Sequence, residues 1–207
     1  MPRSDLLAAI RDTVGSVLIV DDGIPEPVRY PAGGHSEIAD VSIVGLPANA
    51  GKGHAVALGV RTALARHPAP KAVVIIDADG QHPPEAIPRF LAAGEHAELV
   101  VGHRLSDLAT MPRVRRLSNR LSSRILQAVT GRRVHDSQCG MRLLRGRALH
   151  EIPFTGGGYE AETNHLKRCL RAGVSVGWVP IPAIYNGSPS SFRPVRDTLR
   201  VLNALLR

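Results

Sequence analysis

Two carboxylates, Asp77 and Asp79, follow directly after the four β-branched residues 73–76. Residues spaced i, i+2 along an extended chain point to the same side, so both carboxylates can reach one cation. Carboxylates about 6 to 7 Å apart repel each other unless positive charge lies between them. Mg²⁺ and Mn²⁺ prefer oxygen ligands and commonly share them with a substrate diphosphate. The pair therefore predicts a site for a metal and a diphosphate, against the alternative that the acids only cap a turn or a helix.

The apolar run before these acids predicts the element that positions them. Four β-branched residues in a row are typical of a strand buried on both faces, in a parallel sheet that helices cover. Ligands of open α/β sheets bind beyond the carboxyl ends of the strands, where this pair lies. Gly80 relaxes the backbone just after it, and Gln81 and His82 offer further polar groups before two prolines begin the next helix.

Further elements of both kinds are expected along the chain. Strands are predicted at 17–20, 41–44, 99–102 and, as an edge strand, 174–181. Helices are predicted at 1–15, 84–93, 111–129 and 194–207, and two more are given by their apolar positions: one after residue 53 with Val56, Val60 and Leu64, and one entered through 156–162 with Leu166 and Leu170. Residues 24–40 are rich in Pro and Gly and predict a loop, and 136–142 are a loop or a short strand. A chain of 207 residues suits one domain with a sizeable core.

Two more polar groups follow predicted strands. Asp22 lies in an Asp-Asp-Gly sequence and either binds a ribose or a base or forms a solvated turn. Lys52, within Asn-Ala-Gly-Lys-Gly, precedes a helix. The phosphate-loop pattern needs four residues between its glycines and Ser or Thr after the lysine, so that interpretation is rejected. A turn whose amides and Lys52 face a nucleotide stays open beside a plain strand-to-helix turn.

Charge is concentrated in the predicted helix 111–129. Its apolar residues recur at i, i+4 and i+8, and its other face is strongly basic. Such a face is either simply solvated or binds an anion near a lipid surface. Glu160 and Glu162 begin another helix, where acids are favourable with the helix dipole or serve a site.

The composition narrows the class of partner. A net charge of +8 favours anions such as nucleic acid, phosphorylated substrates or an acidic membrane face. Aromatic residues make up only 3%, too few for base-stacking platforms, so nucleic acid is not expected. Two cysteines give neither a disulfide framework nor a Cys-x-x-Cys metal site, which favours a reducing cytosol. The sequence contains no apolar run long enough to span a membrane, and neither a membrane span nor a signal peptide is predicted from it.

Eight short motifs together resemble the family 2 glycosyltransferases, most closely the polyprenyl-phosphate sugar transferases of the dolichyl-phosphate mannose synthase type. In family order they are Val-Asp-Asp-Gly at 20–23, Asn-Ala-Gly-Lys-Gly at 49–53, Asp-Ala-Asp-Gly-Gln at 77–81, Val-Gly-His-Arg at 101–104, Asp-Ser-Gln-Cys-Gly-Met-Arg at 136–142, Gly-Tyr-Glu-Ala-Glu at 158–162, Val-Pro-Ile at 179–181 and Ser-Ser-Phe-Arg at 190–193. The resemblance covers residues 17–197 and departs at 24–25, where the family usually has Ser and an acid.

The resemblance implies a fold and a domain plan. The fold is α/β, a GT-A (Rossmann-like), mostly parallel sheet flanked by helices in a single domain, residues 1–197, with a basic amphipathic helix at 194–207. The family's opening strand, which ends in a Pro-x-Tyr-Asn-Glu type motif and helps to hold the nucleoside, has no counterpart in the sequence. The domain is therefore expected to be N-terminally truncated relative to the family.

The resemblance also implies roles for single residues. Asp77 and Asp79 would hold Mg²⁺ or Mn²⁺, and the nucleotide-sugar donor, a UDP- or GDP-sugar, would be bound by Asp22, Lys52, Asp77 and Gln81. The catalytic positions would be Asp136, Glu160, Glu162 and Arg104, and the acceptor phosphate would meet Arg116, Arg120, Arg142 and Arg193.

The expected reaction moves the sugar, with inversion, to a polyprenyl phosphate. That acceptor is largely ionised near neutral pH and needs no strong base. Three alternatives stay open: transfer to a sugar or small-molecule hydroxyl, for which one of the acids would act as base; a nucleotidyltransferase; and a binding protein without turnover. The expected location is cytoplasmic, with peripheral contact to an anionic membrane surface.

Overall fold

The computed structural model describes residues 9–10, 13–23, 40–67, 69–104, 111, 113–184, 200 and 203. The predicted helix at 1–15 is described at 9–10, which are helical, and at 13–15, which are not, so the helix ends before residue 13. The loop at 24–39, Arg193 and most of the C-terminal helix lie outside the described residues.

The described strands form two sheets. β1 (Ser16–Asp21) and β2 (Asp40–Gly45) pair in parallel. The larger sheet has the order β3-β5-β4-β6, with β3 (Val73–Ile75), β4 (Leu99–His103), β5 (Arg142–Leu144) and β6 (Val176–Pro180). β4 and β6 are parallel, while β5 runs antiparallel to both of its neighbours. Three of these four strands therefore share one direction, which confirms the mostly parallel α/β prediction.

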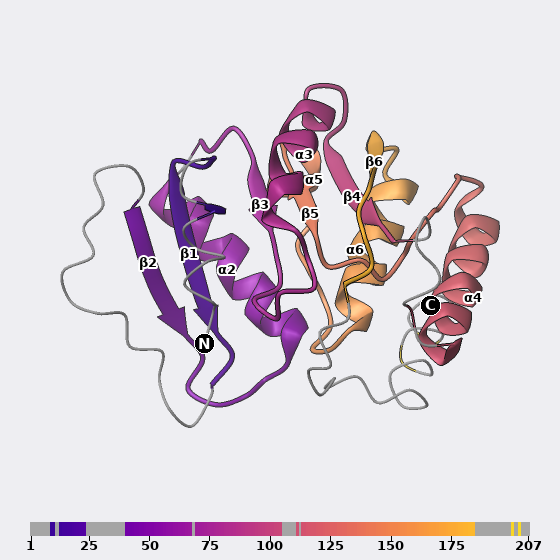
Figure 1. Ribbon diagram of the computed structural model, residues 1–207, viewed down its shortest axis with the longest axis horizontal. Helices are drawn as coiled ribbons and strands as arrows, with labels where there is room; N and C mark the ends of the chain where they lie inside the picture. The colour runs from indigo at the N-terminus through magenta and orange to yellow at the C-terminus, as the bar shows by residue number, and fades with distance from the viewer. Residues whose placement is uncertain are drawn as a thin grey trace.

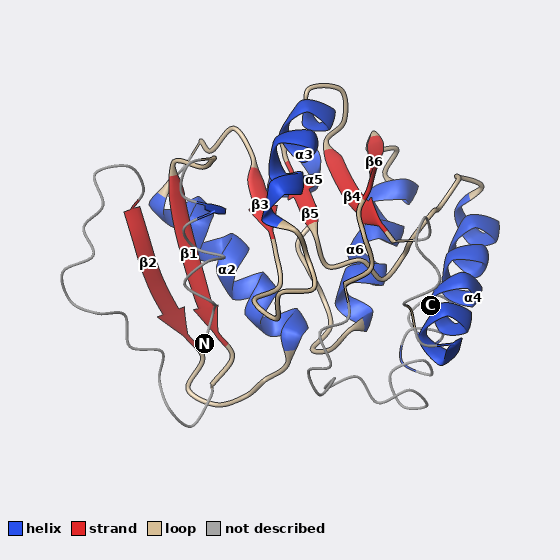
Figure 2. Cartoon of the chain, in the orientation of Figure 1, coloured by secondary structure: helices blue, strands red, loops and turns tan. Residues whose placement is uncertain are grey.

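Helices cover the sheets (Figures 1 and 2). They are α2 (Lys52–Arg66), the 3₁₀ turn η1 (Pro84–Ala86) that leads into α3 (Ile87–Gly94), α4 (Arg113–Thr130), α5 (Gly146–His150) and α6 (Glu160–Arg171). Four of the predicted helices are confirmed to within a few residues. The sequence analysis did not predict α5, and it left β5 open as a loop or a short strand.

The hydrophobic core lies under the larger sheet. Leu99, Val100 and Val101 of β4 are fully buried, as are Met141 and Leu144 around β5. This burial on both faces is what an apolar strand run predicts. By contrast, every residue of β3 and residues 17–21 of β1 are only half-buried.

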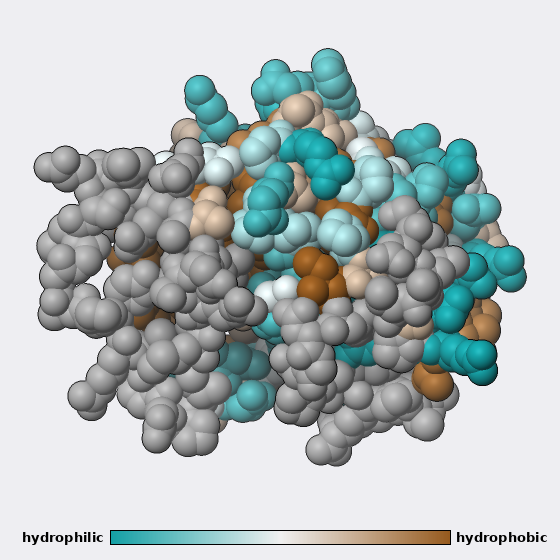
Figure 3. Space-filling model, in the orientation of Figure 1, coloured by the Kyte–Doolittle hydropathy of each residue, from teal (hydrophilic) through white to brown (hydrophobic). Residues whose placement is uncertain are grey.

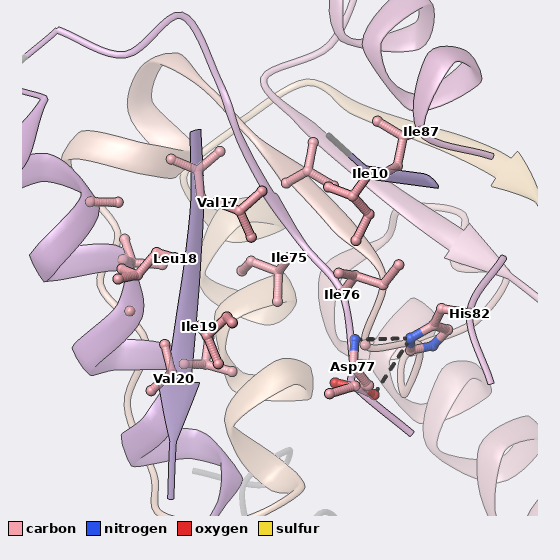
Figure 4. A pocket seen from close by; sticks show the side chains of 18 of the residues that line it. Ile10, Val17, Leu18, Ile19, Val20, Ile75, Ile76, Asp77, His82 and Ile87 are labelled. Carbon is pink, nitrogen blue, oxygen red and sulfur yellow. Dashed lines mark hydrogen bonds and ion pairs between the residues drawn. The ribbon is translucent and has the colours of Figure 1, made fainter. Parts of the chain in front are cut away.

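That half-burial has a structural cause, because no described strand pairs with the facing edges of β1 and β3. Figure 4 shows Val17 to Val20 of β1 running in the same direction as Ile75 to Asp77, side by side across a gap. A cavity of about 1110 Å³ lies between β1 and β3 and is lined by apolar side chains of both strands. Within the described residues the sheet is thus interrupted between β1 and β3.

Candidate active site

The polar end of this cavity holds the strand-end acids. Asp77 follows β3 at its carboxyl end, and Asp77, Asp79, Gln81 and His82 all line the cavity. The Asp77 amide donates to His82 Nδ1 at 3.3 Å, so this nitrogen carries no proton in that bond. Burial lowers the pKa of His82, although the charge of Asp77 acts in the opposite direction. A buried, neutral imidazole thus fixes the turn after β3 (Figure 4).

Asp79 lies at the exposed end of this turn. Its Oδ1 accepts the backbone N–H of Gln81 at 2.9 Å, and the residue is exposed. Both carboxylates line the cavity, that of Asp77 half-buried at the end of the strand and that of Asp79 exposed in the turn.

Lys52 links three elements at the centre of the site. Its Nζ, at the start of α2, lies 2.7 Å from Asp77 Oδ2 and 2.8 Å from Glu162 Oε1 in the first turn of α6. Tyr159 is also close, with its ring centroid 5.6 Å from the ammonium. Burial would lower the pKa of Lys52, but the charges of Asp77 and Glu162 outweigh it and raise that pKa. Burial alone would raise the pKa of Asp77, yet the positive charge of Lys52 outweighs it and brings the pKa down to about 2. We call Lys52, Asp77 and Glu162 the central ion cluster.

Gly140 leaves the room that this cluster occupies. A Cβ at Gly140 would lie 2.6 Å from Asp77 Oδ2, 2.8 Å from Lys52 Nζ and 3.0 Å from Glu162 Oε1. These separations are shorter than ordinary van der Waals contacts, so any side chain there would displace the three charged groups. The absence of a side chain at Gly140 is a spatial requirement of the site.

Asp22 holds the turn that presents Lys52. Its Oδ1 accepts the backbone N–H groups of Ala50 at 3.0 Å and of Gly51 at 3.1 Å. Gly51 has a φ of 95°, a conformation that glycine adopts without strain. The Asp22 carboxylate therefore supports the turn before α2, and it also lines the cavity.

Arg104 and Asp136 form a second ion pair beside the cavity. Asp136, which is fully buried, accepts Arg104 Nε at 3.0 Å on Oδ2 and Arg104 Nη2 at 3.2 Å on Oδ1. Burial would raise the pKa of Asp136, but the guanidinium charge and its hydrogen bonds outweigh this and hold it below its usual range. Arg104 itself lines the cavity. The geometry makes Asp136 the group that orients Arg104.

The structure contradicts the predicted role of Arg142 as an acceptor-phosphate ligand. Arg142 has no exposed surface. Its guanidinium donates to the carbonyl oxygens of Cys139 at 2.9 Å, Glu162 at 2.7 Å and Ser137 at 3.3 Å. A guanidinium held by three backbone oxygens braces the loop that carries Asp136 and Gly140, and no face of it is open to a ligand.

The remaining described residues of the prediction do not line the cavity. Glu160 is half-buried, and its Oε1 accepts the N–H of Gly158 at 3.1 Å. From α4, the cavity lining contains Arg115 and Asn119, and it contains neither Arg116 nor Arg120. Sequence analysis also did not assign Tyr159 or Gln138 to the site, although both line the cavity. Arg115 and Asn119 are spaced i, i+4, so their shared helix face was the available signal.

The donor set at the end of β3 fits a hard divalent cation. Asp77 and Asp79 supply carboxylate oxygens on one wall of a cavity deep enough for a diphosphate. Lys52 already contributes one positive charge beside Asp77. In the part of the chain that the structure describes, no group of three or more His, Cys, Asp or Glu side chains is placed to hold a metal ion, so substrate oxygens or water would complete the coordination.

The topology of the sheets, with polar side chains at the strand ends, is typical of the GT-A glycosyltransferases. Solved structures support this assignment of the fold. The chain superposes with a TM-score of 0.59 on glucosyl-3-phosphoglycerate synthase from Mycobacterium tuberculosis, which was crystallised with Mn²⁺, UDP and glucosyl-3-phosphoglycerate. The two share 18% sequence identity, over 97% of this chain and 81% of the synthase. At that identity the likeness concerns the fold alone.

Sequence comparison identifies the family. The profile of glycosyl transferase family 2 matches residues 6–153, so the chain belongs to this family. It is 37% identical to a dolichyl-phosphate hexose transferase of Haloferax volcanii over 113 residues, which are 53% of this chain and 49% of that protein. It is 30% identical to an undecaprenyl-phosphate mannosyltransferase of Micrococcus luteus over 184 residues, 84% of this chain and 75% of the relative. The chain thus spans about half the length of the first of these relatives.

Proposed function

We propose that this chain catalyses transfer of a hexosyl group from a nucleotide sugar to a polyprenyl phosphate, with a divalent metal ion. One observation carries the proposal. Asp77, Asp79, Lys52 and Arg104 all line one cavity, in which Lys52 is bound to Asp77, so that carboxylates for a metal ion and cations for phosphate groups lie together. The names of the two curated relatives, which are lipid-phosphate sugar transferases, support the choice of acceptor.

On the donor side, Asp77 and Asp79 would hold the metal ion, and the ion would neutralise charge on the departing diphosphate. Lys52 would add positive charge beside the same diphosphate. Asp22 holds the backbone amides of Ala50 and Gly51 in the turn below. Gln81, fixed through its N–H to Asp79, lies where the donor would enter. UDP and GDP both fit these groups.

On the acceptor side, an oxygen of the lipid phosphate would attack the anomeric carbon from the face opposite the diphosphate. The new bond joins this oxygen to the anomeric carbon, and the old carbon–oxygen bond breaks with its electron pair leaving on the nucleoside diphosphate. This step inverts the anomeric centre. Arg104, oriented by Asp136, would draw the acceptor phosphate toward the donor.

The pairing of the acids favours a phosphate acceptor over a hydroxyl acceptor. Asp136 is bound by Arg104 on both oxygens, and its pKa is lowered, which makes it a poor base. Glu162 lies against the ammonium of Lys52. A phosphate with a second pKa of about 6 needs no proton removed at neutral pH, so acids committed to ion pairs are no obstacle.

A thermal-shift panel tests the donor site. The chain is heated with UDP, GDP and their sugars, each with Mn²⁺, with Mg²⁺ or with EDTA. We expect a metal-dependent rise in the melting temperature with one nucleotide, because a ligand that binds only the folded state stabilises it by mass action. Asp79→Asn should abolish this rise. Glu95→Gln, which removes another exposed acid after α3, is the matched control and should keep it.

Transfer assays with the matching nucleotide sugar test the acceptor. Product on a polyprenyl phosphate and none on a sugar hydroxyl is the expected result. Product on the hydroxyl alone would overturn the acceptor assignment, and an Asp79→Asn variant that binds nucleotide as tightly as the parent would overturn the metal assignment.

A further inference from the structure

Helix α4 presents its apolar side chains to solvent and its small polar side chains to the protein. Four large apolar side chains are exposed in the described part of the chain, and all four belong to this helix: Leu117 at 70%, Val114 at 59%, Leu121 at 43% and Val129 at 39%. The buried residues of the same helix are Ser118, Asn119, Ser122, Ser123 and Leu126. This arrangement is the reverse of a helix that packs on a hydrophobic core.

Hydrogen bonds hold the helix in this orientation. Ser122 Oγ lies 2.8 Å from Ser137 Oγ, and the amide of Ser137 donates to Ser123 Oγ at 3.0 Å. Gln138 Nε2 donates to Ser122 Oγ at 3.2 Å. Because the polar face of α4 packs against the loop that carries Asp136, the apolar face on the opposite side of the helix is exposed to solvent.

Arginines flank the apolar stripe. Arg113, Arg120 and Arg124 are exposed and, at 100° per residue, lie in one row beside the stripe. The helix contains no Asp or Glu, so no negative charge within the helix offsets the positive charge of this row. Figure 3 shows hydrophobic and hydrophilic side chains next to each other at the right-hand edge, where Figure 1 places α4. We call Val114, Leu117, Leu121, Val129 and this row of arginines the α4 face.

We infer that the α4 face docks on an anionic lipid bilayer, with the leucines and valines inserted at the level of the headgroups and the arginines paired with lipid phosphates. Apolar side chains next to a row of arginines are the pattern of helices that lie in a membrane interface. None of the helices in the described residues is both long and apolar enough to cross a bilayer, so α4 would lie along the surface.

The α4 face also lies on the same helix as two residues of the candidate active site. The other side of α4 supplies Arg115 and Asn119 to the cavity, so docking through α4 would set that cavity beside the membrane plane. The suggestion that docking brings a lipid-borne acceptor to the site rests on the proposed function. The binding itself needs neither donor nor turnover.

Co-sedimentation with vesicles tests the inference on the 207-residue chain. We expect partitioning onto vesicles of phosphatidylcholine with phosphatidylglycerol, weakening as salt is added, and much less onto pure phosphatidylcholine. Arg120→Gln with Arg124→Gln should lower the partition constant about 25-fold, since each arginine near an anionic surface contributes about fivefold. Leu117→Gln with Leu121→Gln should lower it by more than about tenfold.

Arg61→Gln with Arg89→Gln is the matched control, because it removes the same charge from exposed positions on α2 and α3. It should change partitioning less than about twofold. Equal losses in the control and in the α4 variants, or no loss in either α4 variant, would overturn the inference. Concentration-dependent dimers that the leucine substitutions abolish, without vesicle binding by the parent, would also overturn it in favour of a protein partner.

Transfer assays separate this inference from the proposed function. The Leu117→Gln, Leu121→Gln variant should keep transfer to a short, water-soluble isoprenyl phosphate and lose transfer to the same headgroup on a long chain in vesicles. If the parent transfers sugar to neither acceptor yet partitions as expected, the proposed function fails and the docking surface stands. If both acceptors are used equally by parent and variant, the docking surface fails alone.

Discussion

Replacement of Lys52 by Met would remove the positive charge from the central ion cluster. The ammonium lies within 2.8 Å of both Asp77 and Glu162, and methionine keeps a similar length of side chain without the charge. The side chains of Lys52 and Asp77 are each 23% exposed, and that of Glu162 is 5% exposed. Two largely buried carboxylates would then face each other without a cation between them.

The expected cost follows from this burial. Removing one partner of a buried ion pair costs about 3–5 kcal/mol, because it leaves an uncompensated buried charge. The residual exposure of Lys52 and Asp77 lets water screen part of it, so we expect about 3 kcal/mol, at the lower end of that range. For a domain of this size the melting temperature should fall by about 6–12 °C.

Urea unfolding at pH 7 in EDTA, followed by the fluorescence of the single tryptophan, Trp178, measures the loss. Asp77→Asn combined with Lys52→Met should be less destabilised than Lys52→Met, since one of the facing charges is gone. The pKa of Asp77 is lowered to about 2 from 3.8, so this pairing stabilises the fold above pH 3.8 and loses its effect as the pH falls toward 2. The parent and Lys52→Met should therefore converge in acid. A loss below about 1 kcal/mol at pH 7, or the same loss at pH 7 and at pH 2, would refute the reasoning.

Two further predictions concern other buried groups. His165 is fully buried, stacked on Phe154 with ring centroids 4.1 Å apart, and burial lowers its pKa to about 3 from 6.5. Its neutral ring stabilises the fold above pH 6.5, and the benefit is lost toward pH 3 at about 1.4 kcal/mol per pH unit, so urea titrations of His165→Gln should show a shallower pH dependence in that window; the same slope as the parent would contradict this. Gly140→Ala should destabilise the fold by about 1–3 kcal/mol and weaken nucleotide binding in the thermal-shift panel, because its methyl group would displace the central ion cluster. Gly45→Ala, whose methyl group would meet Asp21 only at an ordinary 3.7 Å, should do neither, and equal effects at the two glycines would show that space at Gly140 is not the cause.

The sequence alone determined the order of the elements and the acids at their ends. Short runs rich in Val, Ile and Leu are local signals of a strand, and β1, β2, β3 and β4 were predicted on that basis. The spacing of Asp77 and Asp79 was equally local. Both line the cavity, Asp79 from the turn after β3 and not from an extended chain.

The sequence shows that an arginine is charged but not which groups it contacts. Only the tertiary structure determined the contacts of Arg142 and Arg104. Arg142 and Arg104 both follow or begin strands, yet Arg142 is enclosed by three carbonyl oxygens and Arg104 borders the cavity. The difference arises from the antiparallel position of β5 between β3 and β4, which buries everything that β5 carries. Pairing of strands far apart in sequence has no local signature, so this role could not be predicted.

The direction of α4 was also decided by tertiary contacts. Periodicity predicted an amphipathic helix, and α4 is one, but periodicity does not say which face turns inward. Serines 122 and 123 find hydrogen-bond partners in the loop at Ser137, and those partners lie 14 or 15 residues away in the chain. A buried hydroxyl without a hydrogen-bond partner costs free energy, and at this site that cost outweighs the gain from burying the leucines. The polar face of α4 therefore packs against the protein, and its apolar face is exposed.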